Sequence, residues 1–506
     1  MAPPRTLTEL FFGSIDRYRA NPVAMRVKRG GTWRELSYAE MLERVQALSL
    51  GLGELGVRAG DRVGILSENR PEWAIADYAC LAARCADVPI YPTLPARQIE
   101  YILRDSGAAA LFVSTREQLG KVLEIRASLP SLQHVIAFDE GLGGNGVLDL
   151  ESVYERGRAV SDRADAWRDA ALLAEPDDLA TLIYTSGTTG DPKGVMLTHG
   201  NIASNVVAGL EVLPLSVRDE CLSFLPLSHI FERMAGHYCM MESGTVINYA
   251  SSIDAVPAEM QERRPTVVLS VPRLFEKIYA RVLENALSGS AVRKHVFFWA
   301  KRAGERWVEY HLSGRAVPPG LAIQYALARR LVFAKLHQRV GGRLRFFVSG
   351  GAPLSAEIAR FFFAAGLPIL EGYGLTETSP VITVNKFGRT RLGTVGPAVT
   401  GVEVRIAEDG EILVRGENVM HGYWQNPDET ARVLLPADDG KGPWLATGDI
   451  GHLDNKGRIV ITDRKKDLIV NDKGDNVSPQ RIEGMLTIQP EIAQAMVYGD
   501  RRPYLV

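Results

Sequence analysis

The sequence is poor in cysteine, with four among 506 residues. Cys80, Cys85, Cys221 and Cys239 provide neither a disulfide framework nor a zinc-ligand spacing. Such sparse usage suits a reducing compartment, where cysteine serves mainly in core packing. The sequence therefore predicts a cytoplasmic protein.

Long apolar runs and a strong net charge are also missing. No run approaches the roughly 18 apolar residues that a spanning helix needs, and residues 1–6 lack the apolar core of a signal peptide. We therefore expect a soluble protein, or one at most peripheral to a membrane. The net charge of -2 argues against general nucleic-acid binding.

What remains is an ordinary globular composition, 46% hydrophobic and 23% charged, as in most soluble proteins. A chain of 506 residues is expected to form more than one domain. Predicted helices alternate with short apolar strands over residues 7–105, which indicates a parallel sheet with helices on its faces. The polar stretch 161–178 predicts a linker to a second unit of the same kind.

The predicted fold class is thus α/β, with two α/β units of mainly parallel sheets, a small β-rich subdomain and a partial α+β C-terminal lobe. Short strands and glycine turns begin near Gly393 and indicate the β-rich part. The predicted domains are 1–170, 171–392, 393–463 and 464–506.

Residues 286–343 form a basic helical insert in the second unit, with eleven Lys/Arg, two Glu and interleaved aromatic residues. A basic, aromatic-rich helical stretch is able to lie on an anionic membrane surface. The alternative is an ordinary helical pair whose aromatic residues face the core and whose charges face water. The sequence leaves both interpretations open.

The residues from Tyr184 to Gly194 read YTSGTTGDPKG, between two predicted strands at 179–183 and 195–198. Glycine lets backbone N–H groups turn toward a ligand, and with hydroxyls and an ammonium they make a site for phosphate oxygens. A plain hairpin loop is the alternative. The hydroxyl density and Lys193 favour phosphate binding.

Two other nucleotide loops fit less well. Asp191 and Pro192 separate Gly190 from Lys193, so the nucleotide-kinase pattern G-x4-G-K-[ST] is broken. Residues 141–146 match the dinucleotide spacing G-x-G-x-x-G, but a strand-like run follows in place of a helix. We interpret residues 141–146 as a surface loop.

The phosphate loop is followed in order by PLSH at 226–229, EGYGLTET at 371–378, TGD at 447–449 and DRKKD at 463–467. These five motifs resemble those of the AMP-forming acyl-adenylating enzymes, the family of acyl-CoA synthetases, luciferases and peptide-synthetase adenylation domains. The resemblance covers essentially the whole chain. The segments 226–233, 371–380 and the basic insert look most like long-chain fatty acyl-CoA synthetases.

The resemblance implies an ATP site built from several motifs. Lys193 would manage the β- and γ-phosphates, Thr376 would reach the α-phosphate, and Glu377 would hold Mg²⁺, an ion that takes one or two carboxylates. Tyr373 would stack on adenine, with Asp449 and Arg464 at the ribose. The implied ATP-binding residues are Thr185, Ser186, Gly187, Thr188, Thr189, Gly190, Lys193, Gly351, Ala352, Pro353, Tyr373, Gly374, Thr376, Asp449 and Arg464.

The resemblance also implies that His229 positions the substrate carboxylate where the acyl and nucleotide pockets meet, which makes Lys193, His229, Thr376 and Glu377 the predicted catalytic residues. From the residues alone, a lone histidine such as His229 is usually structural. Its spacing to Glu232 also suggests a metal pair, but no third ligand has a convincing spacing. Glu377 is alternatively a solvated loop acid, and Asp449 a turn aspartate.

In the last part of the chain, the resemblance makes Lys466 the hinge pivot and assigns Gly474 to CoA binding. The family's C-terminal lobe continues further and carries a catalytic lysine in a Thr-Gly-Lys context. No such lysine occurs up to Val506, so either the C-terminal lobe is truncated here or the natural protein has an impaired first step.

The resemblance thus predicts ATP-dependent activation of a long-chain fatty acid as acyl-AMP and its transfer to CoA, with ATP, Mg²⁺ and CoA as cofactor or co-substrates. Two alternatives remain: an acyl-AMP ligase that loads a carrier protein, and a catalytically impaired protein that binds nucleotide and acyl groups. Peripheral membrane contact through 286–343 is a further expectation.

Overall fold

The computed structural model describes residues 3–185, 191–467, 469–470, 476–477, 479–486, 492, 495–499 and 506. The chain forms two compact units, each assembled from segments that are distant in the sequence. Unit 1 comprises Met1–Val256, Leu375–Pro380 and Glu417–Arg432. Unit 2 comprises Pro257–Gly374, Val381–Gly416 and Val433–Val506.

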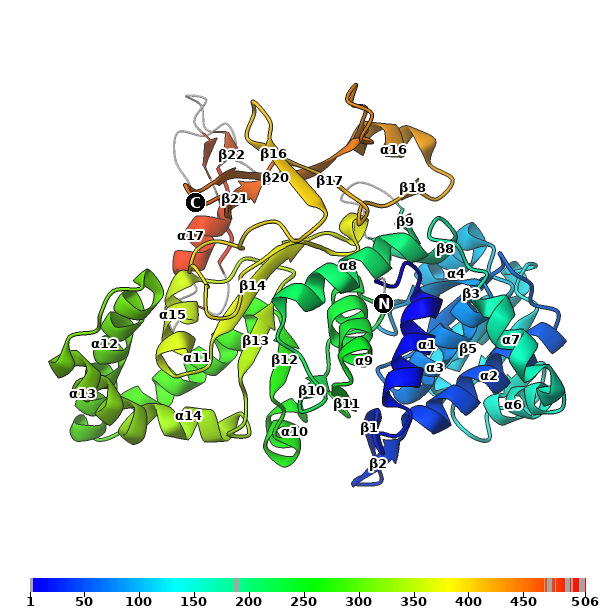
Figure 1. Ribbon diagram of the computed structural model, residues 1–506, viewed down its shortest axis with the longest axis horizontal. Helices are drawn as coiled ribbons and strands as arrows, with labels where there is room; N and C mark the ends of the chain where they lie inside the picture. Colours follow the sequence, from blue (N-terminus) through cyan, green and yellow to red (C-terminus); the bar gives the residue numbers. More distant parts are fainter. Residues whose placement is uncertain are drawn as a thin grey trace. The chain divides into compact units, whose positions relative to one another are not determined.

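A mostly parallel sheet with the strand order β18-β9-β8-β4-β3-β5-β6-β7 lies in unit 1 (Figure 1). Every residue of β4 and β5 is buried, as expected for strands with helices on both faces. The strands are β3 (Arg62–Leu66), β4 (Ala86–Ile90), β5 (Ala110–Val113), β6 (His134–Ala137), β7 (Val147–Asp149), β8 (Leu179–Thr185), β9 (Lys193–Thr198) and β18 (Gly422–Tyr423).

The helices around this sheet begin where the sequence provides start signals. Ser37 and Glu40 form a reciprocal capping box at the start of α2, and Pro71 opens α3 at a position where its missing N–H costs nothing. These helices are α2 (Tyr38–Glu54), α3 (Pro71–Ala82), α4 (Ala96–Ser106), α5 (Arg116–Ile125), α6 (Leu150–Arg158) and α7 (Ala164–Ala171).

The stretch 161–178, predicted as a linker, is not irregular, because α7 occupies much of it; its role between two units stays a prediction. The indole of Trp167 is buried and donates a hydrogen bond to the hydroxyl of Ser49 at 2.9 Å. This one large side chain packs against α2, and the other residues of α7 are alanine, aspartate and arginine.

A second set of strands in unit 1 pairs in the order β10-β11-β1-β2. Strands β10, β11 and β1 are parallel, and β1 and β2 form an antiparallel hairpin. The bounds are β1 (Met25–Arg29), β2 (Thr32–Leu36), β10 (Glu220–Ser223) and β11 (Val246–Tyr249), with helices α1 (Leu7–Tyr18), α8 (His199–Val212), α9 (Cys239–Ser243) and the π-helix η3 (Glu232–Tyr238).

Unit 2 contains parallel strands β12 (Val267–Ser270), β13 (Phe346–Ser349) and β14 (Ile369–Gly374), with β15 (Val381–Val384) antiparallel to β14. Helices α11 (Pro272–Leu287) and α15 (Ala356–Ala364) belong to the same unit. An antiparallel sheet follows, made of β16 (Val402–Ile406), β17 (Glu411–Gly416), β19 (Leu434–Leu435), β20 (Trp444–Leu453) and β21 (Ile459–Arg464). The predicted α/β fold class with a β-rich part is confirmed.

The basic insert is helical, with α12 (Ala291–Ser313), α13 (Pro319–Ala328), the π-helix η4 (Arg329–Phe333) and α14 (Ala334–Arg339). Its aromatic side chains largely pack inward: Phe297 and Phe333 are buried, and Trp307 stacks on Tyr325 at 4.2 Å between ring centres. Among the helices of the described residues, none is long and apolar enough to cross a membrane.

Candidate functional site

The phosphate loop joins two antiparallel strands of unit 1, β8 and β9. Thr185, the last residue of β8, lies opposite Lys193, the first residue of β9. The hairpin therefore fixes both ends of the loop at neighbouring positions. The predicted ATP-binding residues Ser186, Gly187, Thr188, Thr189 and Gly190 lie outside the described residues.

Lys193 points toward side chains that the sequence analysis did not identify. Its ammonium forms an ion pair with Glu429 and lies 5.4 Å from the ring centre of Tyr423. The hydrogen bond from Lys193 holds the pKa of the Glu429 carboxyl below its ordinary value. The lysine side chain is still 31% exposed, so an anion in solvent is able to reach it.

Glu377 lies in the short 3₁₀ turn Thr376–Thr378, directly after Thr376. The hydroxyl of Tyr423 donates a hydrogen bond to Oε1 of Glu377 at 2.8 Å. Burial, followed by the charge of Glu377, raises the pKa of Tyr423, so its hydroxyl keeps its proton. Tyr423 thus contacts both the Glu377 carboxylate and the Lys193 ammonium.

The chemistry of Glu377 fits a magnesium ion that also binds phosphate oxygens. Within the described part of the chain no hydrogen bond reaches Oε2, and no group of three or more His, Cys, Asp or Glu side chains is placed to hold a metal. Mg²⁺ usually takes one or two carboxylates and completes its shell with phosphates and water. A single half-exposed carboxylate suits this mode of binding.

The segment that carries Tyr423 is fixed by side chains and backbone of unit 1. The amide of Asn201 donates to the carbonyls of Glu417 and Val419, and the backbone N–H of Met420 donates to the carbonyl of Glu377 at 2.8 Å. Trp424, the residue after Tyr423, donates its backbone N–H to the carbonyl of Gly194 at 2.7 Å.

A Cβ on Gly194 would lie 3.1 Å from Tyr184 and 3.2 Å from Trp424. Only glycine fits this approach without displacing a neighbour. The motif glycine beside Lys193 therefore also has a packing role.

Neither Tyr423 nor Glu429 was predicted as a site residue. They are far from the phosphate loop in the sequence and belong to none of the five motifs. The one available signal was the aromatic pair Tyr423-Trp424 between Gly422 and Asn426-Pro427, which indicates a turn with buried side chains.

A second cluster of predicted site residues lies in unit 2. The hydroxyl of Tyr373 donates to Oδ2 of Asp449 at 2.7 Å, and Nε of Arg464 lies 3.4 Å from Oδ1 of the same carboxylate. Asp449 and Arg464 are opposite each other on β20 and β21. Burial and the nearby carboxylate raise the pKa of Tyr373. The structure therefore brings these three residues together.

The other predicted ATP-binding residues of unit 2 lie at the ends of strands. Gly374 ends β14, while Gly351, Ala352 and Pro353 follow β13 and are exposed. Gly351 has a φ of +80°, a conformation that glycine adopts without strain.

His229 lies in a turn of unit 1, where its N–H donates to the carbonyl of Pro226 at 2.9 Å. The ring Nδ1 accepts a hydrogen bond from the N–H of Phe231 at 3.1 Å. Burial lowers the pKa of His229, which favours the neutral ring. With Nδ1 as acceptor, the proton resides on Nε2, which is then a hydrogen-bond donor.

Glu232, the other half of the metal pair considered above, is fully buried at the start of η3. Its Oε2 has no hydrogen-bond partner among the described residues. Burial raises its pKa to about 8, so the carboxyl is largely neutral at pH 7. A neutral carboxyl is a poor metal ligand.

The predicted pivot Lys466 is exposed, directly after a well-anchored lysine. The ammonium of Lys465 lies 2.7 Å from Asp409 and 2.8 Å from Glu411. Its N–H donates to the carbonyl of Gly448. Gly474, the predicted CoA contact, lies outside the described residues.

The family model for AMP-binding enzymes matches residues 13–424. The chain is 40% identical over 479 residues to the long-chain-fatty-acid–CoA ligase FadD15 of Mycobacterium bovis, covering 94% of this chain and 77% of that protein. It is 33% identical to the peroxisomal long chain acyl-CoA synthetase 7 of Arabidopsis thaliana, and the alignment covers 98% of this chain and 71% of that protein. The chain belongs to the AMP-binding enzyme family.

Solved structures show the same fold. The long-chain-fatty-acid-CoA ligase FadD1 from Archaeoglobus fulgidus superposes with a TM-score of 0.72 at 20% identity, covering 100% of this chain and 90% of that one. ATP-bound MatB from Rhodopseudomonas palustris gives a TM-score of 0.70 at 25% identity, and the superposition covers 97% of this chain and 85% of that one.

Proposed function

We propose that the protein is a long-chain fatty acid:CoA ligase that uses ATP, Mg²⁺ and CoA. The observation that carries the proposal is the contact of one side chain, Tyr423, with both the Lys193 ammonium and the Glu377 carboxylate. Family membership supplies the reaction class. The long-chain substrate follows the names of relatives that align with 94% or more of this chain.

The first step joins two anions, so electrostatic stabilisation is its main requirement. A fatty-acid carboxylate oxygen attacks the α-phosphorus of ATP, and the bond to pyrophosphate breaks. Lys193 binds the β- and γ-phosphates together with Thr185 and the loop, while Thr376 donates to the α-phosphate. Glu377 would hold Mg²⁺, which when bound would neutralise phosphate charge.

His229 binds the fatty-acid carboxylate through its Nε2–H. A neutral donor is suited to this task, because it orients an oxygen without forming a tight ion pair that would weaken the nucleophile. In the second step the CoA thiol loses its proton and attacks the acyl carbonyl, and AMP leaves. We assign the change of pose between the steps to Lys466 and the pantetheine contact to Gly474.

Asp449 and Arg464 bind the ribose hydroxyls, and Tyr373 stacks on adenine with Gly351, Ala352, Pro353 and Gly374 close to the base. The hydrogen bond from Tyr373 to Asp449 supports this assignment, since it orients a carboxylate that accepts from a diol. The domain boundaries near residues 170, 392 and 463 remain part of the proposal.

Product analysis tests the proposal. The protein is incubated with ATP, Mg²⁺ and either palmitate or acetate, with CoA or acyl carrier protein as acceptor, and products are identified by mass spectrometry. We expect palmitoyl-CoA, AMP and pyrophosphate, with acetate a far poorer substrate because each buried methylene contributes about 0.8 kcal/mol. Loading of the carrier protein alone, or ADP as product, would contradict it.

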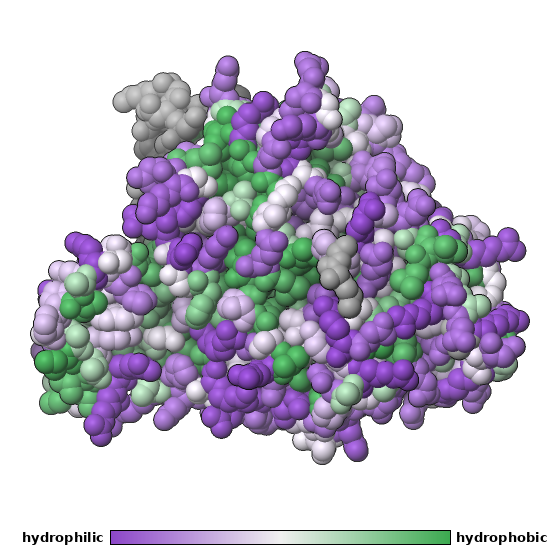
Figure 2. Space-filling model, viewed as in Figure 1, coloured by the Kyte–Doolittle hydropathy of each residue, from purple (hydrophilic) through white to green (hydrophobic). Residues whose placement is uncertain are grey.

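We further propose that the basic insert contacts an anionic membrane surface through aliphatic side chains. Ile323, Leu327 and Leu331 recur at intervals of four residues and are 65%, 49% and 54% exposed. Arg329, Arg330 and Lys335 are exposed beside them. Figure 2 shows hydrophobic and hydrophilic side chains adjacent to one another over α12 and α13. The arrangement combines apolar area with charge complementary to acidic lipids.

Co-sedimentation with vesicles tests this contact. The triple variant Ile323→Gln/Leu327→Gln/Leu331→Gln is expected to lose most binding to phosphatidylglycerol vesicles. A control, Ile253→Gln, changes an equally exposed apolar residue of unit 1 and is expected to bind as the parent does. Equal binding to neutral phosphatidylcholine vesicles, or retention by the triple variant, would rule out the proposed surface.

A further inference from the structure

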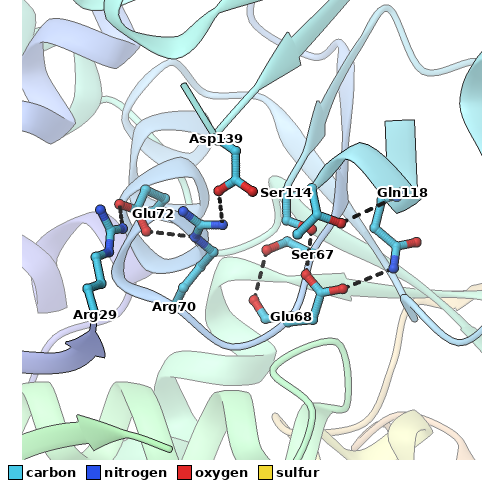
Figure 3. A network of polar contacts seen from close by, with 9 residues as sticks. Arg29, Ser67, Glu68, Arg70, Glu72, Ser114, Gln118 and Asp139 are labelled. Atoms are coloured by element: carbon cyan, nitrogen blue, oxygen red, sulfur yellow. Dashed lines mark hydrogen bonds and ion pairs between the residues drawn. The ribbon is translucent and has the colours of Figure 1, made fainter. Parts of the chain in front are cut away.

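The loop between β3 and α3, residues 67–70, is held in place by polar contacts on both sides of Asn69 (Figure 3). On one side, the Glu68 carboxylate accepts from Ser114 at 2.5 Å and from Gln118 at 2.9 Å. On the other side, Arg70 donates to Glu72 and to Asp139, both at 2.8 Å.

Figure 3 also shows Arg29 on the far oxygen of Glu72, so the second anchor is a chain of four charged groups. The backbone around Asn69 is therefore fixed independently of the contacts that its own side chain makes.

Asn69 uses its amide on the segment that leads to His229. Its Nδ2 donates to the carbonyl of Leu225 at 2.6 Å and to the hydroxyl of Ser223 at 3.2 Å. Its Oδ1 accepts from the N–H of Leu227 at 2.9 Å. In a parallel sheet, one residue of the neighbouring strand bonds to a carbonyl and to an N–H two residues further along. The Asn69 amide makes the same pair of bonds, to Leu225 and Leu227, and so takes the place of a peptide group from a neighbouring strand.

The other side of His229 is attached to the helix that follows Asn69. Arg233, four residues after His229, donates to Asp77 at 2.5 Å and to Asp87 at 2.9 Å, and all three side chains are fully buried. Asp77 belongs to α3. The backbone N–H of Arg233 donates to the carbonyl of His229 at 3.1 Å.

We propose that Asn69 is a positioning residue for the fatty-acid carboxylate, acting through His229. One segment, residues 69–77, fastens the chain on both sides of that histidine: the Asn69 amide before it, and Asp77 through Arg233 after it. The inference rests on the proposed role of His229 in acyl-adenylate formation.

The chemistry at this position requires asparagine. Aspartate would keep the acceptor for Leu227 but would place a carboxylate oxygen against the carbonyl of Leu225. Alanine removes all three hydrogen bonds and leaves the carbonyl of Leu225 and the N–H of Leu227 without their asparagine partner. Because neutral hydrogen bonds make modest net contributions, Asn69→Ala should lower fatty-acid turnover by roughly 10- to 30-fold.

A double-mutant cycle with His229→Ala tests the proposal, with fatty-acid-dependent ATP–pyrophosphate exchange as the activity. If Asn69 acts through His229, Asn69→Ala lowers kcat/KM for the fatty acid in the parent but changes it less than about twofold in the His229→Ala background, since coupled residues are not additive. ATP affinity, measured by calorimetry, should change little in either background.

Asn201→Ala is the matched control, because this asparagine also makes two side-chain bonds to loop carbonyls, at Glu417 and Val419, but none to the His229 segment. It should lower activity by the same factor in both backgrounds. The proposal is overturned if Asn69→Ala is additive with His229→Ala, if His229→Ala has no effect, or if ATP affinity falls in parallel. Absence of exchange in the parent itself would instead refute the proposed function.

Discussion

The hydroxyl of Tyr423 lies 2.8 Å from Oε1 of Glu377, although the two residues are on different segments of unit 1. The same ring lies beneath the Lys193 ammonium. Tyr423 therefore fixes the orientation of the one carboxylate proposed to hold magnesium and limits where the lysine can reach.

Tyr423→Phe keeps the ring under Lys193 and removes only the hydrogen bond to Glu377. A hydrogen bond to a charged group contributes about 1.5–3 kcal/mol, so we expect kcat/KM for Mg-ATP to fall by roughly 10- to 100-fold. Steady-state kinetics at saturating fatty acid measures the effect. Tyr154→Phe is the control, because its buried hydroxyl has no partner among the described residues. Equal kinetics for Tyr423→Phe and the parent would remove Tyr423 from the site.

Glu429→Gln should strengthen phosphate binding, because Glu429 and the phosphates compete for the Lys193 ammonium. The pair is partly exposed, and such pairs are weak, so a decrease of up to about fivefold in the Kd for pyrophosphate is expected. Calorimetric titration with Mg-pyrophosphate measures it. Asp428→Asn, which removes the same charge one residue away, should leave the Kd near the parent value. Weaker binding by Glu429→Gln would mean that Glu429 orients the lysine productively.

Asp449→Asn should weaken binding of AMP as well as ATP, since the ribose is common to both. The Asp449 side chain is 6% exposed and accepts from Tyr373, so the amide also places an NH₂ or a weaker acceptor opposite that hydroxyl. Loss of a charge-assisted hydrogen bond is worth about 1.5–3 kcal/mol, equivalent to roughly 10- to 100-fold in Kd. Equilibrium binding of a fluorescent AMP analogue measures the change. Unaltered AMP affinity would place Asp449 outside the nucleotide site.

Glu371 is predicted to make unfolding easier as the pH rises. Burial raises the pKa of its carboxyl from 4.5 to about 8, and Oε1 has no partner among the described residues. The folded state therefore holds a proton that the unfolded state releases. The stabilisation is complete below about pH 4.5 and is lost as the pH rises toward 8.

Glu371→Gln removes this titration while keeping the shape of the side chain. Between pH 5 and pH 8 the variant should lose less stability than the parent. At pH 8 the difference in this loss of unfolding free energy should be on the order of a few kcal/mol. Thermal melts across this range measure the difference. Parallel melting curves for the two proteins would show that the Glu371 carboxyl is not protonated in the fold.

The fold was largely predictable because local signals were strong. The capping box at Ser37 and the apolar runs before and after the phosphate loop each correspond to an observed element. The alternation of helix and strand indicated a parallel sheet because parallel strands need crossover connections. Residues 161–178 were predicted as a linker from their polar pattern, but they contain α7, whose one large apolar side chain, Trp167, is buried and donates to Ser49.

The candidate site was predictable only where a motif marked it. Lys193, Glu377 and Asp449 belong to motifs, but Tyr423, Glu429 and Asn69 do not. Asn69 bonds to residues more than 150 positions away, and Arg233 pairs with Asp77 at a separation of 156. Such contacts depend on tertiary packing, which no local pattern in the sequence encodes.

The most direct test of the central claim is fatty-acid-dependent ATP–pyrophosphate exchange by the parent, Lys193→Ala and Glu377→Gln. Exchange reports the reversible formation of acyl-AMP without the CoA step. We predict exchange with palmitate that exceeds exchange with acetate, and a loss of at least about 100-fold in both variants, because each removes an interaction with charge that develops in the transition state. Palmitate-independent exchange, or parent-like rates in both variants, would contradict the assignment.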